Sequence, residues 1–458
     1  MARSNNTEVS HNLTLSNTDI DLDALGKMGL TLAKDSTWAS IDDFIPTLLP
    51  ELDKQLGGGI PMGRIVELYS APNVGKTTLA YQITSVANSM NIPVIWLDIE
   101  GTANQDHLPE VGVDINKTII WNPDKWAKEN KKDEATATSI ENIGQRMEDF
   151  IHYFNSIKLP IVLVWDSIGA SSSKSTLEGD FDNQQPGREA KAITQVINKI
   201  QPLIASSKAS LIVINQIRDK MNAMAFGKKT DTPGGKALKH QASVRIELQK
   251  LKALTDINNA DVKFGHHVRF SLEKSKISVP GSKTEAELYG TYGINQYINL
   301  IDTAVTYKII KERSAGSRGK VLNIVDDEGE IHEISRKDLI NEVIEDPEEW
   351  IDLLRPSFQR LIVTLFPEGY PAWDNKSLSV HDVPLLKDLD VAYETYEIMK
   401  KQEEEAELAK IEAEKAKETE KARKQAEKEA KAKAEAEARA QKAKDKAEKL
   451  ANASKEEK

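Results

Sequence analysis

The segment that most constrains the fold of this chain is a loop between a strand-like run and a helix-like run. The loop reads Ser-Ala-Pro-Asn-Val-Gly-Lys-Thr-Thr over residues 70–78, between an apolar run at 64–69 and a helical pattern at 79–83. Backbone N–H groups of such a loop, together with the positive end of the following helix, surround phosphate groups. The pattern therefore predicts a nucleoside triphosphate site, in which Lys76 reaches the β and γ oxygens and Thr77 is a ligand of Mg²⁺.

The whole loop is expected to bind the nucleotide, although its first position departs from the usual pattern. Ser70 stands where a glycine is usual, and a Cβ at that position is expected to disturb the turn. The predicted nucleotide-binding residues of the loop are Ser70, Ala71, Pro72, Asn73, Val74, Gly75, Lys76, Thr77 and Thr78.

Two further apolar runs end in acidic residues that suit such a site. Glu100 follows the run that ends at residue 97, and Asp166 follows the run at 162–165. Ligands of parallel sheets bind at the carboxyl ends of the strands. We therefore expect Glu100 to orient the water that attacks a γ-phosphate, and Asp166 to hold the water shell of Mg²⁺. Thr77 and Asp166 are the predicted metal-site residues.

A third apolar run, at 211–214, leads into a long polar segment. The run ends in Asn215 and Gln216, and the segment after it is rich in Gly and Lys and contains one aromatic residue, Phe226. This composition suits a loop that binds a phosphodiester backbone with limited base contact. A surface loop without a partner has the same composition, so both interpretations stay open at this point.

Length and composition exclude several classes of protein. A chain of 458 residues is long enough for two or three domains. It has no cysteine, which excludes disulfides, zinc–thiolate sites and cysteine nucleophiles, and it has no apolar run of membrane-spanning length. The first residues lack the apolar segment of a secretion signal, so we expect a cytoplasmic protein. The net charge of −11 means that nucleic-acid binding has to use local clusters of Lys and Arg.

The alternation of apolar runs and amphipathic helices predicts the fold class. Predicted strands lie at 65–69, 94–97, 161–165, 211–214, 244–248 and 268–272. This order predicts an α/β core with a mostly parallel central sheet covered on both faces. Beyond it, two short apolar runs at 321–325 and 331–334 flank a turn and predict a β-hairpin.

Four regions are predicted from these patterns. They are an N-terminal arm with a short docking helix at 1–44, an α/β core with the predicted nucleotide site at 45–300, a small α+β domain at 301–396, and a Lys/Glu/Ala-rich tail at 397–458. From residue 401 onward the tail has 17 Lys and Arg against 16 Asp and Glu, and it lacks the apolar seam of a coiled coil. The tail is predicted to be either a solvated single helix or a fraying tail without a partner.

The order and spacing of these motifs resemble the RecA family of recombinases over residues 45 to 300. The segments that carry the resemblance are 59–67, 98–100, 164–167, 215–218, 234–239 and 242–245, together with Lys274 and Lys276. The departures in the phosphate loop and beyond residue 300 are similar to phage recombinases of the UvsX type. They favour a phage-encoded protein that acts in the cytoplasm of a bacterial cell.

The resemblance implies a role for each matching residue. The catalytic set is Lys76, Glu100, Gln216, Lys274 and Lys276. Gln216 would sense the γ-phosphate, and the two later lysines would reach the ATP of a neighbouring subunit, so that hydrolysis depends on assembly. Further nucleotide contacts are implied for Asp98, Asn104, His107 and Asp166, with His107 at the position of an aromatic residue that stacks on adenine.

The resemblance also implies that the helix within residues 1–44 serves oligomerisation and that residues 45–300 are an ATPase and DNA-binding core. Two DNA-binding loops are implied within this core, near residues 178–188 and 218–232. The predicted DNA-binding residues are Arg188, Arg218, Lys220, Phe226, Lys228, Lys229, Gly234, Gly235, Lys236, Lys239 and Arg245.

The function implied is that of a DNA-dependent ATPase, with ATP and Mg²⁺ as cofactors, that forms helical filaments on single-stranded DNA and pairs it with a homologous duplex. A ring in the absence of DNA, and single-strand-binding and loading proteins as partners, are implied as well. Two alternatives stay open: a hexameric helicase with the same ATPase core, and a mediator that binds ATP without strand exchange. The lysine pair favours the filament, and Ser70 keeps the mediator open.

Overall fold

The computed structural model describes residues 13–15, 18–20, 22–30, 43–179, 187–219, 230–255, 261–290, 293–316, 319–371, 380 and 382–456. The chain divides into two compact units, Met1–Leu389 and Asp390–Lys458. The internal boundaries expected at residues 45 and 301 stay a prediction.

The first unit is built on a nine-stranded sheet with the order β15-β14-β13-β12-β5-β9-β8-β6-β7. Its strands are β5 (Ile65–Ser70), β6 (Val94–Asp98), β7 (Thr118–Ile120), β8 (Ile161–Asp166), β9 (Ala209–Gln216), β12 (Val244–Thr255), β13 (Lys263–Ser275), β14 (Lys283–Tyr289) and β15 (Gly293–Ile294). The strands from β12 to β7 in this order are parallel, and β13 to β15 extend the sheet in antiparallel pairing. The predicted α/β fold with a mostly parallel sheet is confirmed.

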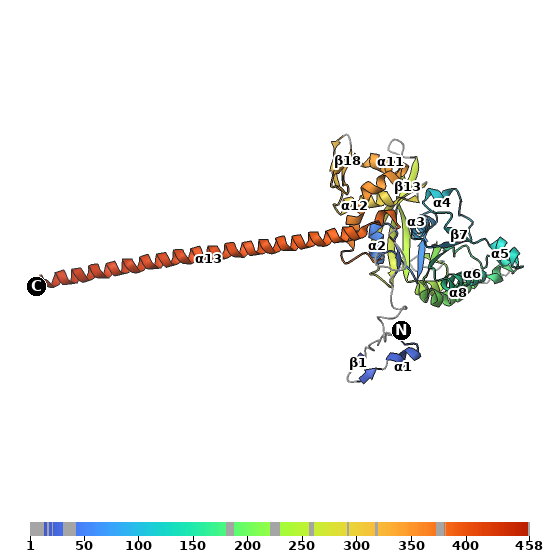
Figure 1. Cartoon of the computed structure of the whole chain (residues 1–458), viewed down its shortest axis with the longest axis horizontal. Helices are drawn as coiled ribbons and strands as arrows, with labels where there is room; N and C mark the ends of the chain where they lie inside the picture. Colours follow the sequence, from blue (N-terminus) through green and yellow to red (C-terminus); the bar gives the residue numbers. More distant parts are fainter. Residues whose placement is uncertain are drawn as a thin grey trace, which may run out of the picture. The chain divides into compact units, whose positions relative to one another are not determined.

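The helices of the first unit are α1 (Leu22–Lys27), α2 (Pro50–Leu56), α3 (Lys76–Ser89), α4 (His107–Glu110), α5 (Pro123–Glu129), α6 (Ile140–Ser156), α7 (Lys174–Leu177), α8 (Arg188–Ala205), α9 (Gly235–Gln241), α10 (Gln296–Thr306), α11 (Arg336–Glu345) and α12 (Pro347–Leu365). In Figure 1, helices such as α3, α6 and α8 cover the sheet, whereas α11 and α12 lie beside the small sheet of β17 (Lys320–Val325) and β18 (Ile331–Ser335). Two single turns of 3₁₀-helix lie at Glu134–Thr136 and Pro384–Leu386.

The core of the sheet is apolar on both faces, as parallel strands require. On one face, alternate residues of β5, β6, β8 and β9 form a buried cluster with α6 and α8. Gly144 of α6 lies against Val196 of α8 with no space for a Cβ, so these two helices pack closely. The other face is covered by α3, where the ring of Tyr81 lies 4.7 Å from that of Trp96 on β6.

Short strands complete the first unit. They are β1 (Leu13–Leu15), β2 (Thr18–Ile20), β3 (Phe44–Ile45), β4 (Ile60–Pro61), β10 (Arg218–Asp219), β11 (Thr230–Asp231), β16 (Lys311–Ser314), β17 (Lys320–Val325) and β18 (Ile331–Ser335). The last three form an antiparallel sheet, in which β17 and β18 pair from Val321↔Ser335 to Val325↔Ile331. The predicted hairpin is therefore confirmed.

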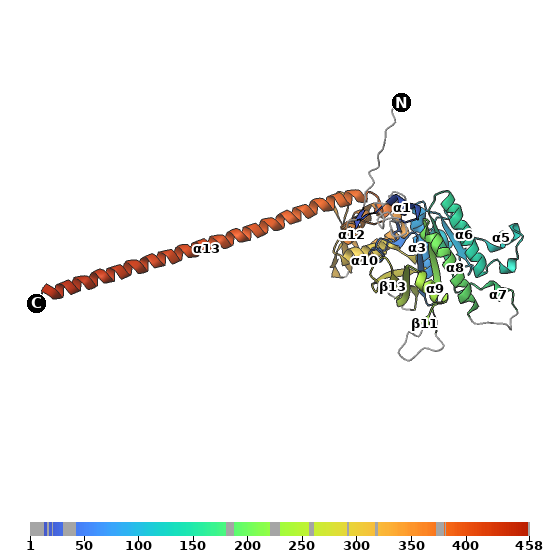
Figure 2. The ribbon, with the colours of Figure 1, turned by 90° about the horizontal axis from the view of Figure 1, so that it is seen from below.

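The second unit is a single helix, α13 (Leu389–Glu456), of 68 residues, drawn as one continuous ribbon in Figures 1 and 2. At about 1.5 Å per residue it is about 100 Å long. Its described side chains after Tyr396 are all exposed, and the large apolar ones among them are Ile398, Met399, Leu408 and Ile411, so this part of the helix is not buried within the unit. Of the two interpretations of the tail, the structure agrees with the single helix, which continues to Glu456. Among the described residues, no helix is both long and apolar enough to cross a membrane.

A buried carboxylate fixes the entry to α2. Asp53 is fully buried and accepts hydrogen bonds from the backbone N and the hydroxyl of Thr47, both at 2.8 Å, and from the backbone N of Leu48 at 3.1 Å. Leu48 has a left-handed φ of 57°, which costs energy for a branched side chain. These bonds hold that turn. Burial raises the pKa of Asp53 to about 7, against the opposing effect of the three donors.

The raised pKa of Asp53 predicts a pH dependence of stability. A carboxyl group with a pKa raised by folding stabilises the native state below its unfolded pKa, near 3.8, and this contribution is lost as the pH rises through about 7. Relative to Asp53→Asn, which cannot titrate, the wild type should lose roughly 1.4 kcal/mol of unfolding free energy per pH unit between these values. Urea unfolding at a series of pH values measures the difference. Parallel curves for the two proteins would contradict the assignment.

Candidate functional site

The phosphate loop is the connection from β5 to α3, and its lysine is held from within. Lys76 is 7% exposed, and its Nζ donates to the Ser70 hydroxyl and to the Ala71 carbonyl oxygen, both at 3.1 Å. Gly75 has φ 114° at the N-cap of α3, and a Cβ there would collide with Leu288 of β14. Burial lowers the pKa of Lys76, and the charges of Asp166 and Glu100 oppose this. The loop thus holds a cation that lacks a full set of acceptors.

Ser70 does not disturb the turn as expected from the sequence. It is the last residue of β5, it is fully buried, and its φ is not in the left-handed region. A Cβ is therefore tolerated at this position. The serine hydroxyl donates to Ala71 O at 2.6 Å and accepts from Lys76, so it is part of the loop's own hydrogen-bond network.

The two residues predicted to hold Mg²⁺ are in contact. Thr77 Oγ1 donates to Asp166 Oδ2 at 2.9 Å. Asp166 is 1% exposed, and burial raises its pKa to about 6; the charges of Glu100 and Asp98 add to this, while Thr77 and Lys76 oppose it. A hydroxyl and a carboxylate are the hard oxygen ligands that Mg²⁺ prefers. A bound cation would also favour the ionised form of this buried acid, so the residues fit a magnesium–triphosphate group.

Glu100 is oriented by two donors that both reach its Oε1. They are the Ser167 hydroxyl and Gln216 Nε2, the latter at 3.1 Å. Ser167 follows β8, and Gln216 is the last residue of β9. The sequence motif contains Ser167, but sequence reasoning gave it no role. Its position one residue beyond an apolar strand that ends in Asp166 could have indicated that it lies near the predicted site.

The parallel register explains why these side chains meet. Ser70 is the register partner of Gln216, and Asp98 is that of Asp166. The carboxyl ends of β5, β9, β8 and β6 therefore share one edge of the sheet, and the predicted lysine, carboxylates and amide lie there together.

A buried ion pair lies directly beneath this edge. Glu67 of β5 is fully buried and pairs with Arg245 Nε of β12. Its other oxygen accepts from Asn215 Nδ2 at 2.8 Å, and the same amide donates to Pro233 O at 2.9 Å. The Arg245 guanidinium also lies over the ring of Tyr69 at 4.6 Å. Sequence reasoning missed Glu67, although an acidic residue inside an apolar strand was the signal.

Arg245, predicted to bind DNA, is engaged inside the chain. Besides Glu67, it donates to Thr232 Oγ1 at 3.4 Å, and its side chain is 15% exposed. It thus joins the strand below the nucleotide site to the end of the segment at 218–232.

The other predicted nucleotide contacts, including His107 at the expected adenine position, lie at the end of β6 and in the segment after it. His107 begins α4, with Nδ1 3.0 Å from Glu110 Oε2 and its ring edge-on to Tyr81 at 6.4 Å. Asn104 Oδ1 accepts from the backbone N of Asp106 at 2.9 Å. Asp98 Oδ2 accepts from Ala103 N at 2.8 Å. Among the described residues, no hydrogen bond joins Asn104 or His107 to the phosphate loop.

Some described residues of the two predicted DNA-binding loops line a common pocket. A pocket of about 340 Å³ is lined by Gly169, Gly187, Arg218, Thr232 and Gly235, among others. Arg218 Nη2 donates to Gly169 O at 2.8 Å, across this pocket.

The other predicted DNA-binding residues divide into two groups. Arg188 begins α8 and donates to Ser175 O at 3.3 Å, Gly234 and Gly235 have left-handed φ values of 95° and 65° where α9 begins, Lys236 lies in α9, and Lys239 pairs with Asp231. The remaining four, Lys220, Phe226, Lys228 and Lys229, lie outside the described residues.

The lysine pair lies at the end of β13. Lys274 Nζ donates to the carbonyl oxygens of Lys239 and His240, at 2.7 and 2.8 Å, and so caps the C-terminus of α9. Burial lowers its pKa, and the charges of Lys276 and Arg245 add to this. Lys276 is exposed.

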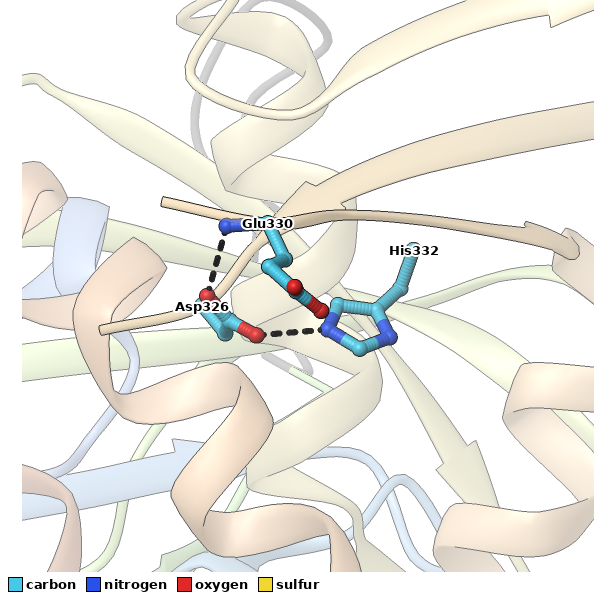
Figure 3. Close-up of side chains that lie close together, drawn as sticks. All are labelled: Asp326, Glu330 and His332. Carbon is cyan, nitrogen blue, oxygen red and sulfur yellow. Dashed lines mark hydrogen bonds and ion pairs between the residues drawn. The ribbon is translucent and has the colours of Figure 1, made fainter. Parts of the chain in front are cut away.

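A second group of ligand-type side chains lies on the β17–β18 hairpin (Figure 3). Asp326 accepts from the backbone N of Glu328 and of Glu330, at 3.0 and 2.8 Å, and pairs with His332 Nε2 at 2.7 Å. These bonds lower the pKa of Asp326, with the His332 bond as the largest cause. The contacts close the turn of the hairpin, and we assign no metal to them.

The buried Glu67–Arg245 pair predicts a stability effect. Arg245→Ala would leave a buried carboxylate without its cation, and we expect it to lower the unfolding free energy by roughly 3–5 kcal/mol. Lys276→Ala, at an exposed position, is the control and should change it by less than about 0.5 kcal/mol. In Arg245→Ala/Glu67→Gln neither charge is left unpaired, so its cost should be below the sum of the single variants. Denaturant unfolding is measured for the wild type, Arg245→Ala, Glu67→Gln, the double variant and the control, and additive costs would contradict a direct pair.

Comparison with known proteins gives one consistent result. Residues 17–295 match the model of the RecA N-terminal domain. The chain is 31% identical to the protein RecA of Roseiflexus sp. (strain RS-1) over 274 residues, which is 60% of this chain and 71% of that protein. The RecA proteins of Streptomyces rimosus and Clostridium acetobutylicum are also 31% identical over 274 residues, covering 67% and 72% of their lengths. This chain is therefore a member of the RecA family.

Proposed function

We propose that the chain is an ATP-dependent recombinase that assembles as a helical filament on single-stranded DNA and pairs it with a homologous duplex. The observation that carries the proposal is the contact of Gln216 with Glu100. One amide at the end of β9 touches the carboxylate of the nucleotide site, and two residues later the chain enters the segment that holds the predicted DNA contacts. Such a residue can report the state of one site to the other.

The roles of the residues in hydrolysis follow from their contacts. Lys76 would bind the triphosphate, and Thr77 and Asp166 would hold Mg²⁺, which supplies charge neutralisation when bound. Both described hydrogen bonds of Glu100 fall on Oε1, so Oε2 is the oxygen proposed to accept the proton of the attacking water. Ser167 and Gln216 hold this carboxylate in one orientation.

The remaining features are part of the same proposal. Asp98, Asn104 and His107 would contact the nucleotide, and Arg188, Arg218 and the Gly/Lys-rich segment would contact the DNA backbone, which needs no base-reading motif. Residues 1–44 would serve self-assembly, and single-strand-binding and loading proteins would be partners. A cytoplasmic location in a bacterial cell, and a phage origin, also remain proposals.

The direct test measures ATP hydrolysis with and without single-stranded DNA and images the same samples. We expect strong stimulation and helical filaments, followed by strand exchange with a homologous duplex. Lys76→Ala should abolish turnover, and Glu100→Gln should lower it roughly 10²-fold or more, because it removes the base. Closed rings on single-stranded DNA would favour the helicase, and filaments without turnover would favour the mediator; either result contradicts the recombinase.

The lysine pair allows the dependence on assembly to be tested separately. Lys274→Ala and Lys276→Ala should both lower ATP turnover and leave ATP binding nearly unchanged, because the lysines are proposed to act on the ATP of a neighbouring subunit. Nucleotide binding, turnover and thermal stability are measured for each.

Lys276 is the informative member, since Lys274 also caps α9 within its own chain. A loss of turnover confined to Lys274→Ala, together with lower thermal stability, would mean that the cap is its only role and would remove the assignment across subunits.

A further inference from the structure

Acidic and basic residues of α13 are concentrated in different segments of the helix. Residues 401–420 contain 4 basic and 8 acidic residues, a net charge of −4, whereas residues 421–449 contain 11 basic and 6 acidic residues, a net charge of +5. The near-neutral total of the tail therefore hides an acidic segment followed by a basic one.

Within the basic segment, six of the basic residues also lie on one face of the helix. Six basic residues lie at helical spacings of three, four or seven to eight residues and form what we call the basic stripe: Lys421, Lys424, Lys428, Lys431, Arg439 and Lys442. At about 100° per residue they fall within an arc of about 80°, over a length of about 32 Å. All six are exposed, and Lys424 pairs with Glu420 at 2.6 Å. Between residues 421 and 442, Glu435 is the one acidic residue that falls in this arc.

Helix stability does not explain the stripe. The helix macrodipole favours basic residues only in the last turn, and the stripe extends far beyond it. Basic neighbours three or four residues apart, such as Lys424 with Lys428 and Lys428 with Lys431, disfavour an isolated helix by a few tenths of a kcal/mol each. Opposite charges at the same spacings, such as Glu420 with Lys424 and Glu435 with Arg439, offset this cost. These pairs therefore give no reason for the basic residues to share one face.

The stripe also lacks the features of two other surfaces. Between residues 421 and 449 the uncharged residues are only Ala and Gln. There is no apolar face to enter a membrane surface and no apolar seam to form a coiled coil. A partner of this segment would therefore have to be recognised through its charged side chains.

We propose that the basic stripe of α13 binds the phosphate backbone of duplex DNA, independently of base sequence. A duplex carries one negative charge per about 1.7 Å of its axis, so a straight row of cations finds many partners along it. The residues before 401 carry a net charge of −12, which is −11 less the +1 of the tail, so a duplex is repelled by most of the chain and attracted to the stripe. The inference rests on the proposed function only in taking DNA as the polyanion that is present.

The chain offers a matched control for the test. The stripe variant is Lys428→Gln, Lys431→Gln and Lys442→Gln. The control is Arg423→Gln, Lys433→Gln and Lys444→Gln, which changes the net charge equally on exposed residues of other faces. Glutamine has nearly the helix propensity of lysine and arginine, and circular dichroism checks that helicity is equal.

The experiment measures binding of the full-length proteins to a fluorescent duplex longer than the stripe, without nucleotide, at roughly 50 to 200 mM salt. The stripe variant should bind on the order of tenfold more weakly at low salt, and the slope of log affinity against log salt should become shallower by about 2.7 for three lost contacts. The control should bind nearly as the wild type does. Equal weakening of both variants, or of neither, would overturn the proposal.

Two further measurements separate this proposal from its alternatives. If the stripe variant changes self-association in sedimentation but not duplex binding, the partner is the acidic segment of another copy, and the proposal is wrong. ATP hydrolysis with single-stranded DNA is measured on the same samples and should be equal in both variants. If none of the proteins hydrolyses ATP but duplex binding still depends on the stripe, the proposed recombinase is rejected. The proposal that the stripe binds duplex DNA is then still supported.

Discussion

The parallel register of β5, β9, β8 and β6 is the constraint on which the rest of the structure depends. Because these strands end at one edge of the sheet, Lys76, Asp166, Glu100 and Gln216 meet although they are far apart in the sequence. The register itself is fixed by the close packing of the buried side chains on each face, since a slip by one residue would move every side chain to the opposite face. Packing of the sheet thus sets the geometry of the nucleotide site.

Burying ionisable groups near this edge costs desolvation free energy, and the structure offsets this cost to different degrees for different groups. Glu67 has a cation and an amide as partners, so its charge is compensated within the chain. Asp166 has one hydroxyl donor and keeps a raised pKa, and Lys76 a lowered one. The compensated group lies under the site, and the two that are less well compensated lie in it. This is the pattern expected where a charged ligand completes the electrostatics.

The sequence was sufficient to predict the fold class, and that Thr77, Asp166, Glu100 and Gln216 lie near one another at one edge of the sheet, because apolar periodicity and strand ends are local features. It predicted the hairpin at 320–335 for the same reason. It could not predict that Ser70 is tolerated, since this depends on Ser70 being the last residue of a strand rather than part of a turn. The pairing of Arg245 with Glu67 joins two strands 178 positions apart and needs the strand order, which periodicity does not give. The division of basic residues between faces of α13 was present in the sequence but became meaningful only once the tail was a continuous helix.

β13 links two parts of the molecule that have so far been described separately. Near its start, His266 Nε2 lies 3.2 Å from Val74 O in the phosphate loop, and near its end Lys274 caps α9. The strand is hydrogen-bonded to β12 on one side and β14 on the other. From Gly265 to Ser271 it is paired on both sides, so a shift of the phosphate loop relative to α9 would require this part of the sheet to move as one piece or ladder bonds to break. The antiparallel extension is therefore a mechanical connection between the phosphate loop and α9, the helix that follows the predicted DNA-binding segment.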